Sequence, residues 1–194
     1  MGRGASGPRA LVSSTHALSA DAAVTALAAA ADLAERRSDP ATAKYQAWAV
    51  PYSLERAEAL IKEMVERADV VPGHWFPLAV ERPSDGRIVG DCTIHLSEDG
   101  HSAQIGYTLH PWARGHYFST EAAGAVCDYV VDALGVHRIE AHTDPRNIAS
   151  VRVLDRLGFV HEGTMRESYW VGDTVTDDAL YGLLAHEWKQ RRLP

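Results

Sequence analysis

The sequence contains few cysteines. Cys92 and Cys127 are the two among 194 residues, and this number excludes a small fold held together by several disulfide bonds. No CxxC pair and no cluster of cysteine with histidine has the spacing of a structural zinc site. The ten histidines are scattered along the chain. We therefore expect surface or hydrogen-bonded histidines and no metal ligands.

Long apolar segments and phosphate-binding motifs are also missing. A membrane-spanning helix needs about 20 apolar residues, whereas the apolar run 22–31 is short and rich in alanine. It lacks the leucine-rich centre and basic start of a secretory signal, so we expect a cytoplasmic protein without a membrane partner. No GxxxxGK[ST] or GxGxxG motif indicates an ordinary nucleotide-binding protein. The net charge of −7 disfavours a broad basic surface for nucleic acid.

What remains is the composition of a globular domain. Hydrophobic residues make up 46% and charged residues 23% of the chain, which are ordinary values for a folded protein. The length fits one domain with a substantial core. Residues 1–18 are rich in glycine, serine and alanine and have no clear period. We expect them to form a flexible tail or a weak first strand, and residues 19–194 to form the folded domain.

Hydrophobic periodicity predicts the secondary structure. Helices are predicted at 20–37, 54–68, 118–134 and 147–157. Strands are predicted at 75–81, 87–96, 102–110, 136–142, 159–170 and 174–184. The buried face of the third helix is predicted to consist of Ala122, Ala125, Val126, Tyr129, Val130 and Ala133. The alternation of strands and helices in the second half predicts an α/β domain with a mixed sheet covered by helices.

The segment 109–122 is the first with chemical meaning. A strand ends, Arg114-Gly115 forms a turn, and a helix begins near Phe118. The backbone N–H groups at such a helix start lack intrahelical acceptors, and the helix dipole adds positive potential. This arrangement is typical of a phosphate site, to which Arg114 adds a charge. An ordinary strand-to-helix connection is the alternative, because most such turns bind no phosphate.

The second such segment is 147–163. Asn147 and Ser150 lie three residues apart, on one side of a predicted helix start. Taken alone, Asn147 is interpreted as a simple helix cap.

Together the two segments resemble the acyl-CoA-dependent N-acyltransferases of the GNAT superfamily. The branch of ribosomal-protein N-terminal acetyltransferases is the most similar. The resemblance covers about 36–190, and 147–163 is its most specific part. Its motifs are Pro111, Arg114-Gly115, Thr120-Glu121-Ala122, Asn147-x-x-Ser150, Leu157-Gly158-Phe159 and Glu162-Gly163.

The resemblance implies a particular fold and donor site. It implies a mixed, largely antiparallel sheet of six or seven strands with helices on both faces, splayed at the centre between the strands near 103–110 and 137–143. The pantetheine arm of acetyl-CoA would lie in the gap, and the pyrophosphate on the N–H groups of 114–119. The cofactor-binding residues that it implies are Tyr107, Thr108, Leu109, Arg114, Gly115, His116, Tyr117, Phe118, Ser119, Asn147 and Ser150.

Two departures from the family pattern bear on this expectation. Tyr117 stands where the branch has a small residue, and tyrosine adopts left-handed backbone angles less readily than glycine. We therefore expect either a Tyr117 side chain turned outward or a weakened CoA site. Residues 1–18 also lack the usual Arg-Leu-x-Leu-Arg-Pro opening, which leaves one sheet edge undefined.

The implied reaction is transfer of an acetyl group from acetyl-CoA to a primary amine of a protein N-terminus or a small molecule. By resemblance, Ser150 hydrogen-bonds to the departing sulfur and Asn147 contacts the pantetheine. Some relatives place a carboxylate base at the position of Tyr169, and tyrosine is a poor base because its ordinary pKa is about 10. Glu167, two residues earlier on the same side of a regular strand, is the candidate base, and Tyr169 is an alternative group to serve the thiolate.

A second function is compatible with the same residues. A non-catalytic acyl-CoA-binding or protein-interaction module of this fold would explain Tyr117 and the absence of a clear base. A homodimer is compatible with either function.

Overall fold

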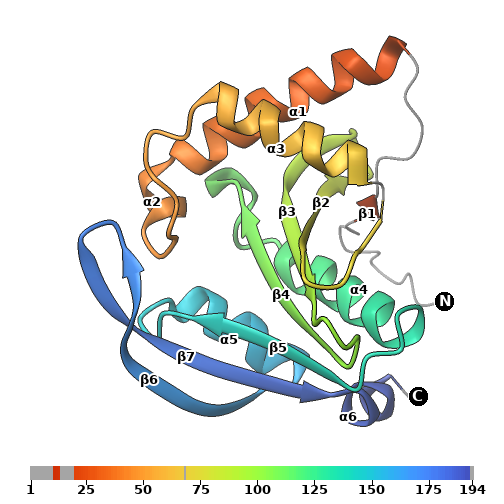
Figure 1. Ribbon diagram of the computed structural model, residues 1–194, viewed down its shortest axis with the longest axis vertical. Coiled ribbons are helices and arrows are strands. Elements are labelled where there is room, and N and C mark those ends of the chain that lie inside the picture. The colour runs from red at the N-terminus through yellow and green to blue at the C-terminus, as the bar shows by residue number, and fades with distance from the viewer. Residues whose placement is uncertain (1–10, 14–19, 68, 193–194) are drawn as a thin grey trace, which may run out of the picture.

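The computed structural model describes residues 11–13, 20–67 and 69–192, and Figure 1 shows their arrangement. The helices are α1 (Ala20–Ser38), α2 (Pro40–Ala43), α3 (Leu54–Arg67), α4 (Phe118–Asp132), α5 (Ile148–Leu157) and α6 (Ala185–Arg191), with a 3-10 turn η1 (Pro111–Ala113). The strands are β1 (Leu11–Ser13), β2 (Trp75–Arg82), β3 (Arg87–Leu96), β4 (Ser102–Leu109), β5 (Arg138–Thr143), β6 (Val160–Val171) and β7 (Thr174–Leu184).

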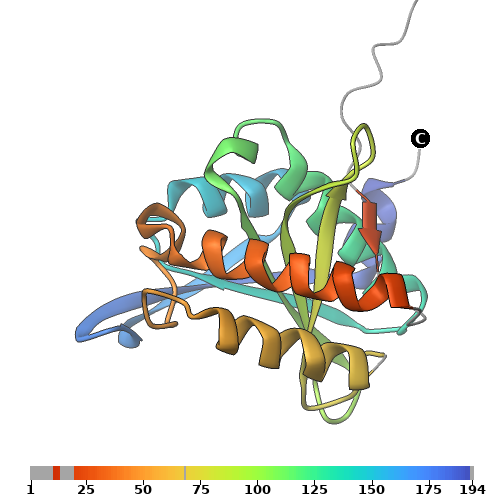
Figure 2. The same ribbon diagram turned by 90° about the horizontal axis from the view of Figure 1, so that it is seen from above.

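The strands form one seven-stranded sheet in the order β1-β2-β3-β4-β5-β7-β6. The β4–β5 pair is parallel, and the other pairs are antiparallel. Helices α1 and α3 cover one face, and α4 and α5 cover the other (Figure 2). This architecture confirms the predicted α/β fold with a mixed, largely antiparallel sheet.

The N-terminal segment is described in part. Leu11–Ser13 pair with Ala79–Glu81 and form an edge strand, as the weak-strand alternative predicted. Residues 1–10 and 14–19 lie outside the described residues, so the expectation of a flexible tail over 1–18 stays a prediction there.

Local sequence signals account for most element boundaries. The Ser53 hydroxyl accepts a hydrogen bond from the Arg56 N–H at 3.2 Å and caps α3. Gly158 ends α5 with a φ of 88°, a left-handed conformation that glycine adopts at low cost. The strand predicted from 136 begins instead at Arg138, and the short helices α2 and α6 were not predicted.

The main core lies between the sheet and α4. Ala122, Val126 and Val130 are buried there as predicted. The prediction was wrong for Ala125, Tyr129 and Ala133, which are exposed. The neighbouring face of α4 is buried instead through Ala123, Cys127 and Val131. The reason is that apolar residues surround this helix, so their spacing alone does not determine which side meets the sheet.

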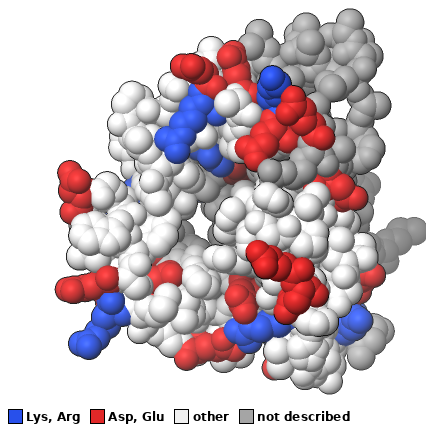
Figure 3. Space-filling view, in the orientation of Figure 1, with Lys and Arg blue, Asp and Glu red and all other residues white. Residues whose placement is uncertain are grey.

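A smaller core holds α1 and α3 together on the opposite face of the sheet. It contains Ala30, Leu33, Tyr52 and Ala57. On the side shown in Figure 3, basic and acidic side chains are interspersed. No described helix is long and apolar enough to cross a membrane.

Candidate functional site

The sheet opens between its two central strands. β5 pairs with β4 through three residues, Arg138–Glu140 against Ser102–Gln104, and further along the two strands separate. A cavity of about 960 Å³ lies at this opening, lined by the ends of β4 and β5, the start of α5, and parts of α1, α3 and β7. This confirms the predicted splay, and it leaves the β5-facing edge of 106–109 without a paired strand among the described residues.

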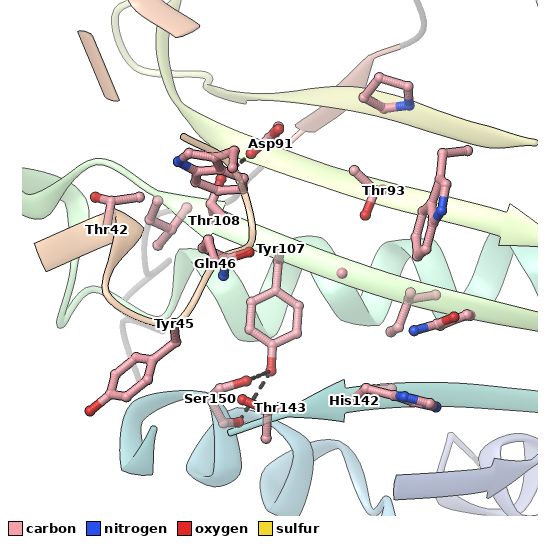
Figure 4. Close-up of a pocket in the computed structure, with 18 of the residues that line it drawn as sticks. Thr42, Tyr45, Gln46, Asp91, Thr93, Tyr107, Thr108, His142, Thr143 and Ser150 are labelled. Atoms are coloured by element: carbon pink, nitrogen blue, oxygen red, sulfur yellow. Dashed lines mark hydrogen bonds between the residues drawn. The ribbon is translucent and has the colours of Figure 1, made fainter. Parts of the chain in front are cut away.

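On the α4/α5 side of the opening, Tyr107 and Ser150 contact each other (Figure 4). The Tyr107 hydroxyl lies 3.0 Å from the Ser150 hydroxyl and donates to the Ser150 carbonyl at 3.1 Å. Burial raises the pKa of Tyr107 well above its ordinary value, so this hydroxyl remains a proton donor. The Asn147 side chain accepts from the Ser150 N–H at 3.3 Å. The interpretation of Asn147 as a helix cap is therefore confirmed.

A buried ionic network lies on the α1/α3 side of the opening. The Asp91 carboxylate accepts from Arg36 at 2.5 Å and from Arg37 at 3.3 Å, and it also accepts from the Thr108 hydroxyl. Burial acts to raise the pKa of Asp91, but the two guanidinium groups and the Thr108 hydroxyl together hold it below its ordinary value. The network ties α1 to β3 and β4 beside the cavity.

His142 and Asp178 form a second polar pair on this side. His142 comes from β5 and Asp178 from β7, and the His142 Nδ1 lies 2.9 Å from an Asp178 carboxylate oxygen. Both residues line the cavity, as does Tyr169. Burial raises the pKa of Tyr169, so less of this hydroxyl is ionised at neutral pH than in an exposed tyrosine.

The connection from β4 to α4 contains the predicted Arg114-Gly115 turn and the start of α4. Gly115 has a φ of 82°, and an added Cβ would meet no atom within 4 Å, so the space in front of the turn is open. Arg114 donates to the Thr42 hydroxyl at 2.7 Å. The N–H groups of the first turn of α4 point out of the helix start without intrahelical acceptors.

Tyr117 occupies the N-cap of α4 in a left-handed conformation, with a φ of 63°. Its side chain is 62% exposed and packs under the Arg156 guanidinium, 5.1 Å from the ring centroid. The Tyr117 side chain is therefore turned outward, which was the first of the two expectations for this residue. Its backbone adopts the left-handed conformation that is costly for tyrosine.

The structure separates the two candidates on β6. Tyr169 lines the cavity, but Glu167 does not belong to its lining. The pairing of β6 with β7 is irregular between Met165 and Tyr169, and Glu167 has a φ of 49° with its N–H bound to Asp177. The assumption that Glu167 and Tyr169 share one side of a regular strand is therefore wrong, because a bulge interrupts the alternation.

Sequence reasoning missed the functional potential of His142 and Asp178. His142 was treated as one scattered histidine, because the register that brings β5 beside β7 is not visible in a single sequence. Among the described residues, no group of three or more histidine, cysteine or acidic side chains is arranged to hold a metal.

Comparison with known proteins agrees with this geometry. The model of the acetyltransferase (GNAT) domain matches residues 24–160. The chain belongs to the GNAT acetyltransferase family. It is an N-acyltransferase by family, and the alternative of a non-catalytic module is not favoured, since the named relatives are N-acetyltransferases.

Individual relatives cover most of the domain. The chain is 33% identical over 135 residues to the probable N-acetyltransferase YjcK of Bacillus subtilis, covering 69% of this chain and 74% of that protein. It is 27% identical over 122 residues to the uS5-alanine N-acetyltransferase of Escherichia coli, covering 62% and 63%. The fold is similar to the spermidine N-acetyltransferase of Vibrio cholerae in complex with CoA and spermine, with a TM-score of 0.75, 16% identity, and 93% and 98% coverage.

Proposed function

We propose that this protein transfers an acetyl group from acetyl-CoA to the primary amine of a protein N-terminus or a small molecule, through the cavity at the splayed β4–β5 opening. The observation that carries the proposal is the combination of an unpaired β4 edge with an open helix start at the end of the same strand. The thioester supplies the activated acyl group. The remaining chemistry belongs to the chain's own residues.

The donor side follows from the polar groups at the opening. Tyr107, Thr108 and Leu109 offer backbone groups that bind the amides of pantetheine as a neighbouring strand would. The N–H groups of 115–119, with Arg114 beside them, hold the pyrophosphate. A backbone N–H near Leu109 stabilises the negative charge that develops on the carbonyl oxygen, and the Ser150 hydroxyl donates to the departing sulfur.

We infer the chemical class of the acceptor from the substrates named for the relatives. An alanine of ribosomal protein uS5 is the acceptor named for the E. coli relative, and spermidine is named for the V. cholerae protein. Both are primary amines, and both need a proton removed before attack. We also propose that residues 19–194 form the transferase domain and act in the cytoplasm, where the free and buried Cys92 and Cys127 would remain reduced.

The proposal is tested by acetyl transfer and by CoA binding. Purified protein is incubated with acetyl-CoA and either an alanine-starting peptide or spermidine, and thiol release is measured. Thiol release that depends on an amine supports the proposal. No release with any primary amine, together with no CoA binding in calorimetry, would contradict it.

We expect Gly115→Glu to weaken CoA binding more than tenfold. The substitution places a carboxylate in the open space before the α4 N-terminus, where it repels the phosphates, and a side chain at a positive φ. Isothermal calorimetry with CoA measures the effect. Gly100→Glu is the matched control, because Gly100 has a φ of 72° and equally open surroundings in the β3–β4 turn. Equal CoA affinity in both variants would place the phosphates elsewhere.

A further inference from the structure

The histidine–aspartate pair on β5 and β7 lies at the central opening but has no role in donor binding. Residues paired across a sheet share a face, and alternate residues along a strand return to it. His142 pairs with Leu180, so Asp178, two residues from Leu180, lies on the same face. Tyr169 pairs with Thr176 and lies on this face too.

Ser150 reaches the opening from the opposite face. Ile139 and Ala141 alternate with His142 and are buried in the main core on the α4/α5 side, which is the side of Tyr107 and Ser150. His142 and Ser150 therefore line one cavity from opposite faces of the sheet. A thioester held in the gap would have its sulfur on the Ser150 side and its carbonyl carbon open to attack from the His142 side.

The hydrogen bond to Asp178 determines which nitrogen of His142 is basic. An ionised carboxylate only accepts hydrogen bonds, so Nδ1 carries the proton and Nε2 carries the lone pair. Asp178 is buried, whereas the His142 side chain is 33% exposed. No described residue makes a hydrogen bond to Nε2, so this lone pair is available to a molecule in the cavity.

The other acidic and basic groups of the cavity are less suited to accept a proton. Asp91 is engaged by Arg36 and Arg37, and Asp144 by Arg146. Tyr169 is protonated because burial raises its pKa. Glu63 and His74 also line the cavity, from α3 and from the segment before β2, and neither belongs to the strands that border the opening.

We propose that His142 is the general base that deprotonates the acceptor amine, and that Asp178 is the positioning residue that fixes its tautomer. This proposal rests on the proposed acetyl transfer. Nε2 takes one proton from the acceptor ammonium, and the neutral nitrogen forms a bond to the thioester carbonyl carbon. The C–S bond breaks with its electron pair on sulfur. The second amine proton passes to sulfur through solvent, and His142 releases its proton to water.

The charged and titratable groups that share the cavity with His142 come from several elements. On its own strand, Glu140 shares the face of His142 and pairs with Arg138. From the other strands and helices, the titratable side chains that line the cavity are Asp178 of β7, Tyr169 of β6, Tyr107 of β4, Asp91 of β3, Arg37 of α1 and Glu63 of α3. The connecting segments add Tyr45, His74, Arg114 and Asp144.

The test compares His142→Gln and His142→Ala with His137→Ala in the full-length chain. His137 is exposed just before β5 and outside the cavity, so its removal should leave the rate unchanged. We expect both His142 variants to lose about 100-fold or more in kcat/KM for the best amine, the scale of general base catalysis. CoA affinity should remain that of the wild type. The acidic limb of the pH–rate profile should disappear, and added imidazole should restore part of the rate of His142→Ala.

The outcomes separate the two proposals. An active wild type with a His142→Gln rate within threefold of it, or with an unchanged acidic limb, would overturn the role of His142 and leave acetyl transfer intact. A wild type that binds CoA but acetylates no amine would overturn both. Asp178→Asn gives an independent readout, since it should alter the pH profile while the imidazole ring stays in place.

Discussion

Asp91→Ala is expected to lower the free energy of unfolding by about 3–5 kcal/mol, the usual effect of removing one partner from a buried ion pair. Arg36 is 2% exposed and would be left buried with the Asp32 carboxylate, 3.8 Å from its Nε, as its remaining ion-pair partner. Urea denaturation followed by circular dichroism measures the change, with the midpoint and slope compared with those of the wild type.

The control for this prediction is Asp85→Ala. Asp85 forms an ion pair with Arg82 in the exposed β2–β3 turn, where such pairs add little stability. The urea midpoint of Asp85→Ala should therefore match that of the wild type. A loss for Asp91→Ala no larger than that of the control would mean that the network contributes no stability.

The same network predicts a pH dependence. The pKa of Asp91 is lowered in the folded protein, so the folded state binds its proton less readily than the unfolded chain. The stabilisation is complete above the unfolded pKa of about 3.9 and is lost as the pH falls through the lower folded value. The difference in stability between wild type and Asp91→Ala should therefore shrink on acidification and remain constant between pH 6 and 8.

Ser150→Ala is expected to lower kcat by about ten- to a hundredfold while CoA affinity stays nearly unchanged. A hydrogen bond to the sulfur strengthens as negative charge builds, so its loss acts mainly in the transition state. The expected cost of about 1.5–3 kcal/mol is that of a hydrogen bond to a charged group. Tyr107, whose hydroxyl lies 3.0 Å from that of Ser150, holds the Ser150 hydroxyl beside the opening.

Steady-state kinetics with saturating amine, together with calorimetry for CoA, measure the effect. Ser97→Ala in the β3–β4 turn is the matched control, because the Ser97 hydroxyl donates to Asp99 and neither residue lines the cavity. Asn147→Ala should differ from Ser150→Ala and from Ser97→Ala in two ways. It should raise the acetyl-CoA concentration needed for half-maximal rate, and the loss of the helix cap should lower the free energy of unfolding by about 1 kcal/mol. A wild-type rate for Ser150→Ala would mean that Ser150 has only a structural role in the helix. Water or Tyr169 would then have to stabilise the departing thiolate.

The sequence by itself determined most of the elements and the two segments that we propose for donor binding. Turn residues such as Asp85-Gly86, caps such as Ser53 and Asn147, and the alternation along β3 act through neighbours in the chain, so their effect is visible without tertiary structure. The Arg114-Gly115 turn and the Asn147-x-x-Ser150 helix start are also contiguous segments. For that reason the splayed sheet and the two segments beside it were predicted at the correct positions.

Tertiary structure alone decided which side chains meet on the proposed acceptor side. His142 meets Asp178 across 36 residues, and Arg36 meets Asp91 across 55, because of strand order and register that a single sequence does not contain. The bulge between Met165 and Tyr169 keeps Glu167 out of the cavity lining. Side chains alternate between the two faces of a sheet only while the strand pairing is regular, and a single sequence does not show where that pairing breaks. Local chemistry predicted the turn proposed for phosphate binding, whereas the long-range pairing of β5 with β7 brings His142, the proposed base, to Asp178.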